Sequence, residues 1–314
     1  MRSHLALHRY TLGLAAATLV LIFVGGLVTS TGSGLAVPDW PLSYGKLFPP
    51  MVGGVLFEHG HRMVAASVGF LTLVLAVWVW RGPSRPWVRR LGTLALAAVI
   101  CQGVLGGMTV LFLLPPAVSI AHAGLAQIFF CLTIALVAVT SPGWTEERPR
   151  IADPGIRRLA NATTAVIYGQ ILLGAWMRHT GSGLAIPDFP LAYGRLVPPF
   201  FTRQILIHFA HRAGAVVVVV FVTWLVARIL LRHRTESALV RAAWALAGTL
   251  VLQILLGAET IWSSRGVLPT TLHVAGGAAT LAAALWLRLA LERIVHREDA
   301  LAGAPARAAA EQRP

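Results

Sequence analysis

Four histidines lie at related positions in this 314-residue chain: His61, His122, His211 and His273. Each falls near the start of a long apolar segment, where ionisable residues are costly in a bilayer and usually mark function. Haem iron takes axial histidine ligands, so two imidazoles that face each other could bind one haem from both sides. Zinc is the weaker alternative, because no cysteine or carboxylate completes a four-ligand set around both pairs.

A carboxylate accompanies only one of the two pairs. Glu58 precedes His61 by three residues, whereas His208 precedes His211 by the same spacing. Residues three apart share a helix face, so Glu58 is expected to face the first pair of histidines. A partly desolvated carboxyl group there could exchange protons near neutral pH. The alternative is that Glu58 only interacts favourably with the dipole at a helix N-terminus.

Two arginines, Arg62 and Arg212, directly follow a candidate ligand. Arginine pairs with carboxylates through two hydrogen bonds, which makes both residues candidates for contact with haem propionates. The alternative is that each guanidinium extends to lipid headgroups. His59, His208 and Glu259 are assigned no role.

The composition indicates a membrane protein. Hydrophobic residues make up 56% of the chain and charged residues only 12%, whereas soluble proteins carry about 25% charged residues. The net charge of +14 could suggest a nucleic-acid partner, but the basic residues lie in short gaps between long apolar runs, so we expect a lipid bilayer and no nucleic acid. Eight runs reach the roughly 20 residues that a spanning helix needs. They are approximately 10–29, 57–80, 89–112, 117–140, 157–178, 204–231, 238–261 and 269–291.

Backbone groups in lipid must be satisfied internally, so the sequence predicts an all-α membrane protein with eight transmembrane helices. Most Lys and Arg residues lie at the N-terminus, in the second, fourth and sixth connections and in the C-terminal tail. The positive-inside rule therefore predicts a multi-pass protein of the cell membrane with both termini in the cytoplasm. The tail 297–314 is rich in Ala, Arg, Glu and Pro, a composition that favours disorder.

The chain contains an internal duplication. Residues 31–45 reappear almost unchanged as residues 180–194. Further along, Gln102, Gly106, Thr109 and His122 return as Gln253, Gly257, Thr260 and His273. Each half, 1–145 and 146–296, contains four expected helices, so the two copies run in the same sense across the membrane as a parallel repeat. We expect two pseudo-symmetric four-helix bundles, each holding one pair of histidines.

The ordered set of motifs resembles the haem A synthase family of integral membrane proteins, over roughly residues 8–292. The motifs are Thr31-Gly-Ser-Gly34, Pro38-Asp-Trp-Pro41, Glu58-x-x-His61-Arg62, His122, His211-Arg212 and His273. The resemblance implies that haem O is oxidised at its C8 methyl to a formyl group, giving haem A for haem-copper cytochrome oxidase. It also implies a catalytic role for Glu58. His61 and His122 would bind the iron of the substrate haem, and His211 and His273 that of a haem b cofactor.

The chain departs from many members of that family at one point. They carry a cysteine pair in the first outer loop, whereas residues 30–56 and 179–203 of this chain contain no cysteine. The expected partners are haem O, with a haem O synthase, cytochrome oxidase assembly factors and further copies of this chain as candidates. A non-catalytic di-haem b electron-transfer protein is the alternative function. A transporter is a third, disfavoured because the polar residues gather near one face rather than at the midplane.

Overall fold

The computed structural model describes residues 2–142, 144 and 153–310, and the side chains of 5–142, 144 and 153–292. Within this part the chain forms eight helices and two isolated β-bridges, Ser43–Lys46 and Ala192–Arg195. The helices are α1 Arg2–Ser30, α2 Gly54–Arg81, α3 Pro86–Leu111, α4 Pro116–Thr140, α5 Pro154–His179, α6 Arg203–Arg232, α7 Ser237–Trp262 and α8 Val267–Ala310. The predicted all-α class is confirmed for the described residues.

Several helices begin where the sequence supplies a suitable first turn. Pro86, Pro116 and Pro154 occupy the first helical position of α3, α4 and α5, where proline loses no intrahelical hydrogen bond. The Thr202 side chain accepts a hydrogen bond from the Ile205 N–H and so caps α6.

Seven of the described helices are long and apolar enough to cross a membrane, and they indicate a multi-pass membrane protein. α5 does not meet that criterion, so the eighth predicted span stays a prediction. Polar side chains interrupt it: Arg157, Arg158, Asn161, Gln170 and Arg178.

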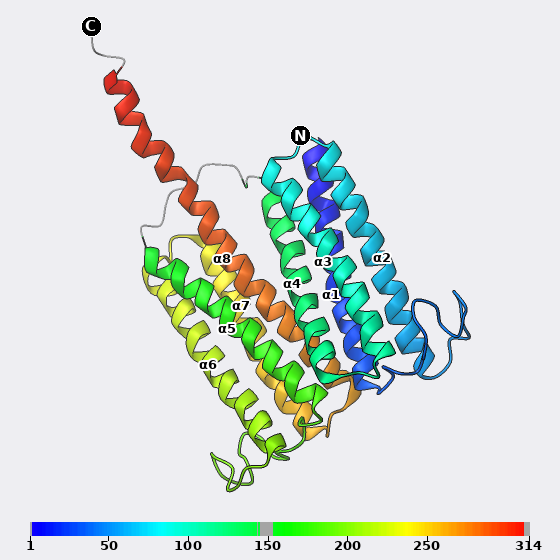
Figure 1. Ribbon diagram of the computed structural model, residues 1–314. Coiled ribbons are helices and arrows are strands. Elements are labelled where there is room, and N and C mark those ends of the chain that lie inside the picture. Colours follow the sequence, from blue (N-terminus) through cyan, green and yellow to red (C-terminus); the bar gives the residue numbers. More distant parts are fainter. Residues whose placement is uncertain (1, 143, 145–152, 311–314) are drawn as a thin grey trace.

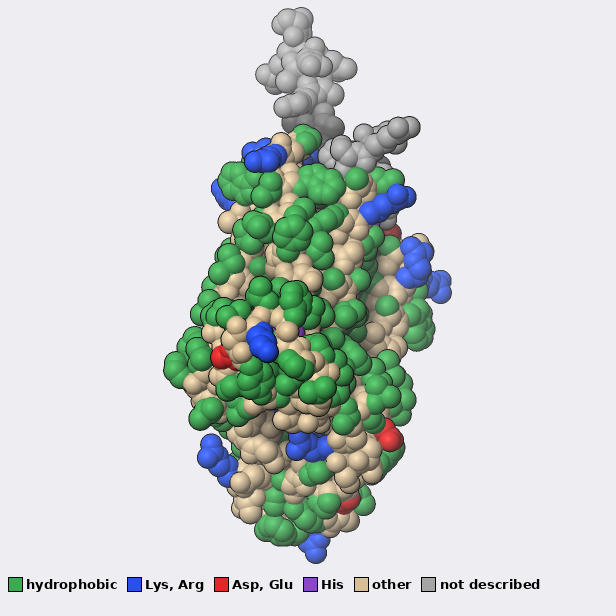
Figure 2. Space-filling view, turned by 90° about the vertical axis from the view of Figure 1, so that its right-hand side faces the viewer, with side chains coloured by type: hydrophobic (Ala, Val, Ile, Leu, Met, Phe, Trp, Pro, Cys, Tyr) green, Lys and Arg blue, Asp and Glu red, His purple; other side chains and the backbone are tan. Residues whose placement is uncertain are grey.

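The surface of the helices agrees with a lipid environment. Figure 2 shows apolar side chains over most of the visible face, with Lys and Arg singly or in small groups. Phe70, Leu94 and Val216 are 65%, 55% and 63% exposed on their helices. Soluble monomers rarely expose apolar side chains over so large an area, whereas contact with lipid requires it.

The helices pack as two rings of four. α1 to α4 each contact their neighbours, and α4 closes the ring against α1; α5 to α8 do the same, with α8 against α5 (Figure 1). The rings meet where α8 contacts α1 and α4, and where α4 contacts α5. Glycines allow this approach: a Cβ at Gly26 of α1 would lie 3.3 Å from Thr271 Cγ2 of α8, and one at Gly124 of α4 would lie 2.8 Å from Leu172 Cδ2 of α5.

Two long loops, 31–53 and 180–202, cover one end of the rings and are built alike. The Asp39 carboxylate accepts hydrogen bonds from the N–H groups of Tyr44 and Gly45 at 2.7 and 2.8 Å. Asp188 binds Tyr193 and Gly194 at the same two distances. These bonds, led by those from Gly45 and Gly194, hold the pKa of each carboxyl group below its usual value.

The N-terminal end of α1 and the C-terminal end of α8 lie at the opposite end of the molecule from these loops (Figure 1). α8 contains a stretch apolar enough to cross a membrane within Val267–Glu292, and the helix continues to Ala310, away from the rings. The helix thus includes much of the tail 297–314, for which the composition favours disorder. Residues 311–314 lie outside the described residues.

Candidate functional site

Each of the four predicted histidines packs against a glycine of the preceding helix. His61 of α2 faces Gly25 of α1, and His122, His211 and His273 face Gly106, Gly174 and Gly257 in the same way. A Cβ on any of these glycines would lie 2.9 to 3.2 Å from the Cε1 atom of the histidine. A larger residue would therefore crowd the imidazole, most of all at Gly174, and each imidazole packs closely between the two helices of its pair.

Three glutamines form a second element of this arrangement. Gln102, Gln170 and Gln253 lie one turn before the glycines of α3, α5 and α7, and their Nε2 atoms donate to the carbonyl oxygens of His122, His211 and His273 at 3.0, 2.7 and 2.9 Å. In α1 the corresponding residue is Leu21. The backbone of the histidine helix is thus tied to its neighbour in three of the four cases.

The spacing of the second histidine pair suits a shared metal ion. The ring centroids of His211 and His273 are 6.5 Å apart, with an angle of 82° between the planes. A metal–imidazole bond is about 2 Å long, so two rings on opposite sides of one ion have centroids roughly 6 Å apart. His61 and His122 of the first ring lie close enough to interact electrostatically. The structure thus brings His211 and His273 together as a pair, while His61 and His122 lie within electrostatic range of each other in the first ring.

Buried polar atoms without partners lie around both pairs. Among the described residues they include Nδ1 of His61 and of His122, and the Oε1 atoms of Gln102, Gln170 and Gln253. Buried polar atoms are normally hydrogen-bonded, so these mark places where a bound group is expected. No three His, Cys, Asp or Glu side chains of the described chain come together as a larger ligand set. The residues present therefore fit a haem bound by two imidazoles in each ring.

Glu58 is buried at the outer end of α2 and is bound on both oxygens. Its Oε2 accepts a hydrogen bond from the Val37 N–H of the first loop at 2.8 Å. Its Oε1 accepts one from Arg62 at 2.7 Å, which is also an ion pair. Both carboxylate oxygens therefore act as acceptors, one from the loop backbone and one from Arg62. The contacts of Glu58 are with the loop and Arg62, so its expected orientation toward the first histidine pair stays a prediction.

Arg62 and Arg212 bind the loops 31–53 and 180–202. Arg62 donates to the carbonyl oxygens of Asp39 and Leu42 at 2.8 and 2.7 Å. Arg212 donates to the carbonyl oxygens of Asp188 and Leu191, both at 2.7 Å. These donors are committed to holding the loops against α2 and α6, and a contact with haem propionates stays a prediction.

One polar pair at this end was not found by sequence reasoning. His59 is buried, and its Nδ1 atom lies 2.8 Å from Ser43 Oγ, which also accepts a hydrogen bond from Arg62. The counterparts in the second ring are Phe209 and Ala192, which pack together in an apolar cluster. Ser43 and His59 are both polar, whereas both of their counterparts are apolar. This paired difference between the repeats is the signal that could have revealed the contact.

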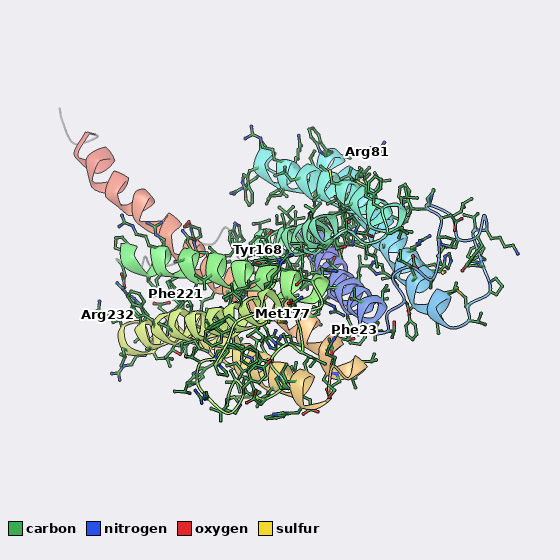
Figure 3. All side chains as sticks on the ribbon, turned by 60° about the horizontal axis from the view of Figure 1, so that its bottom comes forward. Phe23, Arg81, Tyr168, Met177, Phe221 and Arg232 are labelled. Carbon is green, nitrogen blue, oxygen red and sulfur yellow. The ribbon has the colours of Figure 1, made fainter. Side chains whose placement is uncertain are left out.

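Two further residues missed by the sequence analysis lie where the rings meet. Arg178 and His179 are the last two residues of α5 and directly follow Met177, which is labelled in Figure 3. His179 interacts electrostatically with His122 of the first ring, and Arg178 with His273 of the second. Their counterparts in the first half are the uncharged residues Thr29 and Ser30. This difference between the repeats is the only sequence signal that could have pointed to them.

Comparison with known proteins identifies the family. A family described as cytochrome oxidase assembly protein, COX15-CtaA, matches residues 8–54 and 54–285. A heme A synthase from Symbiobacterium thermophilum is 34% identical over 282 residues, 85% of this chain and 90% of the relative. Heme A synthases of Shouchella clausii and Alkalihalophilus pseudofirmus are 31% and 26% identical, over 68% and 86% of this chain and 72% and 92% of the relatives. By motifs, fold and relatives, the chain belongs to the haem A synthase family of cytochrome oxidase assembly proteins.

Proposed function

We propose that this protein is a haem A synthase that oxidises the C8 methyl group of haem O to a formyl group, giving haem A for haem-copper cytochrome oxidase. The observation that carries the proposal is the difference between two otherwise similar sites. Both rings hold a glycine-backed histidine pair, but only the first has a buried carboxylate, Glu58, one turn from a ligand. The relatives named heme A synthase support the same activity.

In this proposal His61 and His122 bind the iron of substrate haem O, and His211 and His273 bind that of a resident haem b. Conversion of a methyl group to a formyl group adds one oxygen atom, here taken from water, and releases four protons and four electrons (R–CH3 + H2O → R–CHO + 4 H+ + 4 e−), so the site needs water, a proton acceptor and an external electron acceptor reached through the resident haem. Glu58 is placed to accept protons, and its hydrogen bonds from Val37 and Arg62 hold the carboxylate in position. Haem b supplies one-electron transfer when it is bound.

The membrane arrangement belongs to the same proposal. We place eight spans in the cell membrane as a parallel repeat, with the two rings as pseudo-symmetric bundles and both termini in the cytoplasm. The loops 31–53 and 180–202 then face outward over the histidine sites. A haem O synthase supplies the substrate, and assembly factors of cytochrome oxidase receive the product.

The test is haem extraction from cells that express this protein together with a haem O synthase. The proposal predicts that haem A appears. Unchanged haem O, in cells where the protein is present and carries its haem b, would overturn it.

One observation favours a second candidate, a non-catalytic di-haem electron-transfer protein. Glu58 makes contacts that His208 also makes in the second ring, so its burial has a structural explanation. In that case the same extraction returns only haem O, while the purified protein shows two b-type haems.

A further inference from the structure

We propose that Arg178 binds a propionate carboxylate of the haem held in the second ring and thereby raises the reduction potential of that haem. This inference rests on the proposed function, because it takes a haem between His211 and His273 as given. It concerns a residue outside the repeated ligand pattern, and it makes the second site depend on a contact with the first ring.

Arg178 lies on the correct side of α5. Gly174, which packs against His211, precedes it by four residues, so both share one helix face and Arg178 is one turn further toward the loops. Arg178 also interacts electrostatically with His273, the other ligand of the pair. The guanidinium is therefore close to His273, one of the two residues expected to bind the iron, and one turn beyond the glycine that faces the other.

The hydrogen bonds of Arg178 leave part of its guanidinium unsatisfied. One terminal nitrogen, Nη2, donates to Ser30 Oγ at 2.9 Å and to the Gly26 carbonyl oxygen at 3.3 Å. The Nε atom is buried and has no hydrogen-bond partner. A buried donor without an acceptor is costly, so this edge of the side chain is expected to receive an acceptor from a bound molecule.

The charge around Arg178 requires an anion. Arg265 is close enough to interact with it unfavourably, and within the described residues no carboxylate forms an ion pair with Arg178. A buried cation next to a second cation is stabilised only by a negative partner. Carboxylates suit the planar fork of arginine best, and propionates are the carboxylates that a haem carries.

No other helix offers a cation at this position. The residues four places after the histidine-facing glycines of α1, α3 and α7 are Thr29, Val110 and Ile261. Thr29 uses its hydroxyl on carbonyl oxygens of its own helix, at 3.0 and 3.2 Å. The arginine is therefore specific to the second site, as Glu58 is specific to the first.

The first ring holds this arginine in place. α1 approaches α8 closely at Gly26, and the Thr271 hydroxyl donates to Ser30 Oγ at 3.1 Å. Ser30 thus links α8 to Arg178 of α5, so three helices from both rings meet around the guanidinium. The second haem site is complete only when the two rings are packed together.

The experiment is a redox titration of the purified full-length protein with its haem, followed by haem absorbance. A positive charge near the iron favours the ferrous state, so Arg178→Gln should raise the ferric-to-ferrous ratio at a fixed potential. We expect about a tenfold rise, which corresponds to a midpoint about 59 mV lower. Arg178→Lys should keep most of the wild-type value. Arg195→Gln removes the same charge from an exposed loop position and should change nothing.

Each titration is run in detergent without phospholipid and in nanodiscs of anionic phospholipid. An equal shift in both supports a propionate, whereas a shift confined to nanodiscs identifies a lipid phosphate as the anion and overturns the proposal. An unchanged midpoint in haem-loaded Arg178→Gln also overturns it. Loss of haem from Arg178→Gln but not from Arg178→Lys supports the proposal. Loss of haem from both variants, in protein that is still folded, counts against it. A wild-type protein without b-type haem would instead refute the proposed function.

Discussion

Glu58 of α2 and His208 of α6 make the same two contacts in the two rings. Each accepts a hydrogen bond from the backbone N–H of an outer loop, Val37 for Glu58 and Ile186 for His208, at 2.8 and 3.1 Å. Each also contacts an arginine four residues later: Arg62 donates to Glu58 at 2.7 Å, and Arg212 Nε lies 3.2 Å from the second ring nitrogen of His208, although a neutral imidazole accepts at only one nitrogen at a time. The duplication has therefore kept the anchoring of the loop while its chemistry diverged.

This equivalence separates catalysis from loop anchoring at Glu58. Glu58→His places in the first ring the residue that performs the anchoring in the second, so the fold and the resident haem should be retained. Haem A formation should fall about 100-fold or more, the usual contribution of a general acid or base. The measurement is the ratio of haem A to haem O in cells that co-express a haem O synthase. Wild-type haem A in this variant would show that Glu58 serves only as an anchor.

The two histidine pairs are expected to bind their haems independently. His211→Ala or His273→Ala should remove the low-spin b-type absorption of the purified protein, because each provides one axial ligand in the second ring. His61→Ala should retain that absorption and lose haem A formation. His233→Ala is the control. It removes only a contact with Asp153 at the end of α6, and it should retain both the b-type absorption and haem A formation. Retention of the resident haem by both second-ring variants would refute their assignment.

The sequence predicted the parts of this site that repeat. The four histidines, their positions near the starts of alternate helices and the all-helical class follow from apolar length and duplicated motifs. The sequence also predicted a span at 157–178, and α5 forms there, but Arg157, Arg158 and Arg178 lower its hydropathy below that of the other seven helices. Hydropathy measures composition, whereas the helix is held by packing against α4, α6 and α8.

The contacts that the sequence did not predict join distant segments. Arg62 lies next to His61 in the chain, which suggested the haem, but its donors bind carbonyl oxygens of a loop about 20 residues earlier. The contact between Arg178 and Ser30 joins residues from different halves. Backbone carbonyls carry no sequence signal, so such partners are visible only once the chain is folded.

The outer loops should respond to acid through Asp39 and Asp188. Each folded pKa lies below the unfolded value of about 3.8, so the ionised carboxylate stabilises the loop above that value. This stabilisation is lost as the pH falls through the lower, folded pKa. Hydrogen exchange at the Tyr44 and Gly45 amides, corrected for the intrinsic rate, should stay slow from pH 8 to about pH 4 and quicken only below that. In Asp39→Asn the acid step should be missing; its persistence would assign the step to another group.

The glycines that face the histidines give the last prediction. A Cβ at Gly174 would lie 2.9 Å from His211 Cε1, so Gly174→Ala must displace the imidazole or part α5 from α6. Crowding of a packed site usually costs about 1–3 kcal/mol, and a displaced axial ligand binds iron less well. We expect the haem-to-protein ratio of the purified variant to fall, with a lower affinity for added haem. Gly169→Ala is the matched control, because it lies on the same helix and a Cβ there meets nothing within 4 Å. If both variants bound haem as the wild type does, the close packing of Gly174 on His211 would not be what positions the ligand.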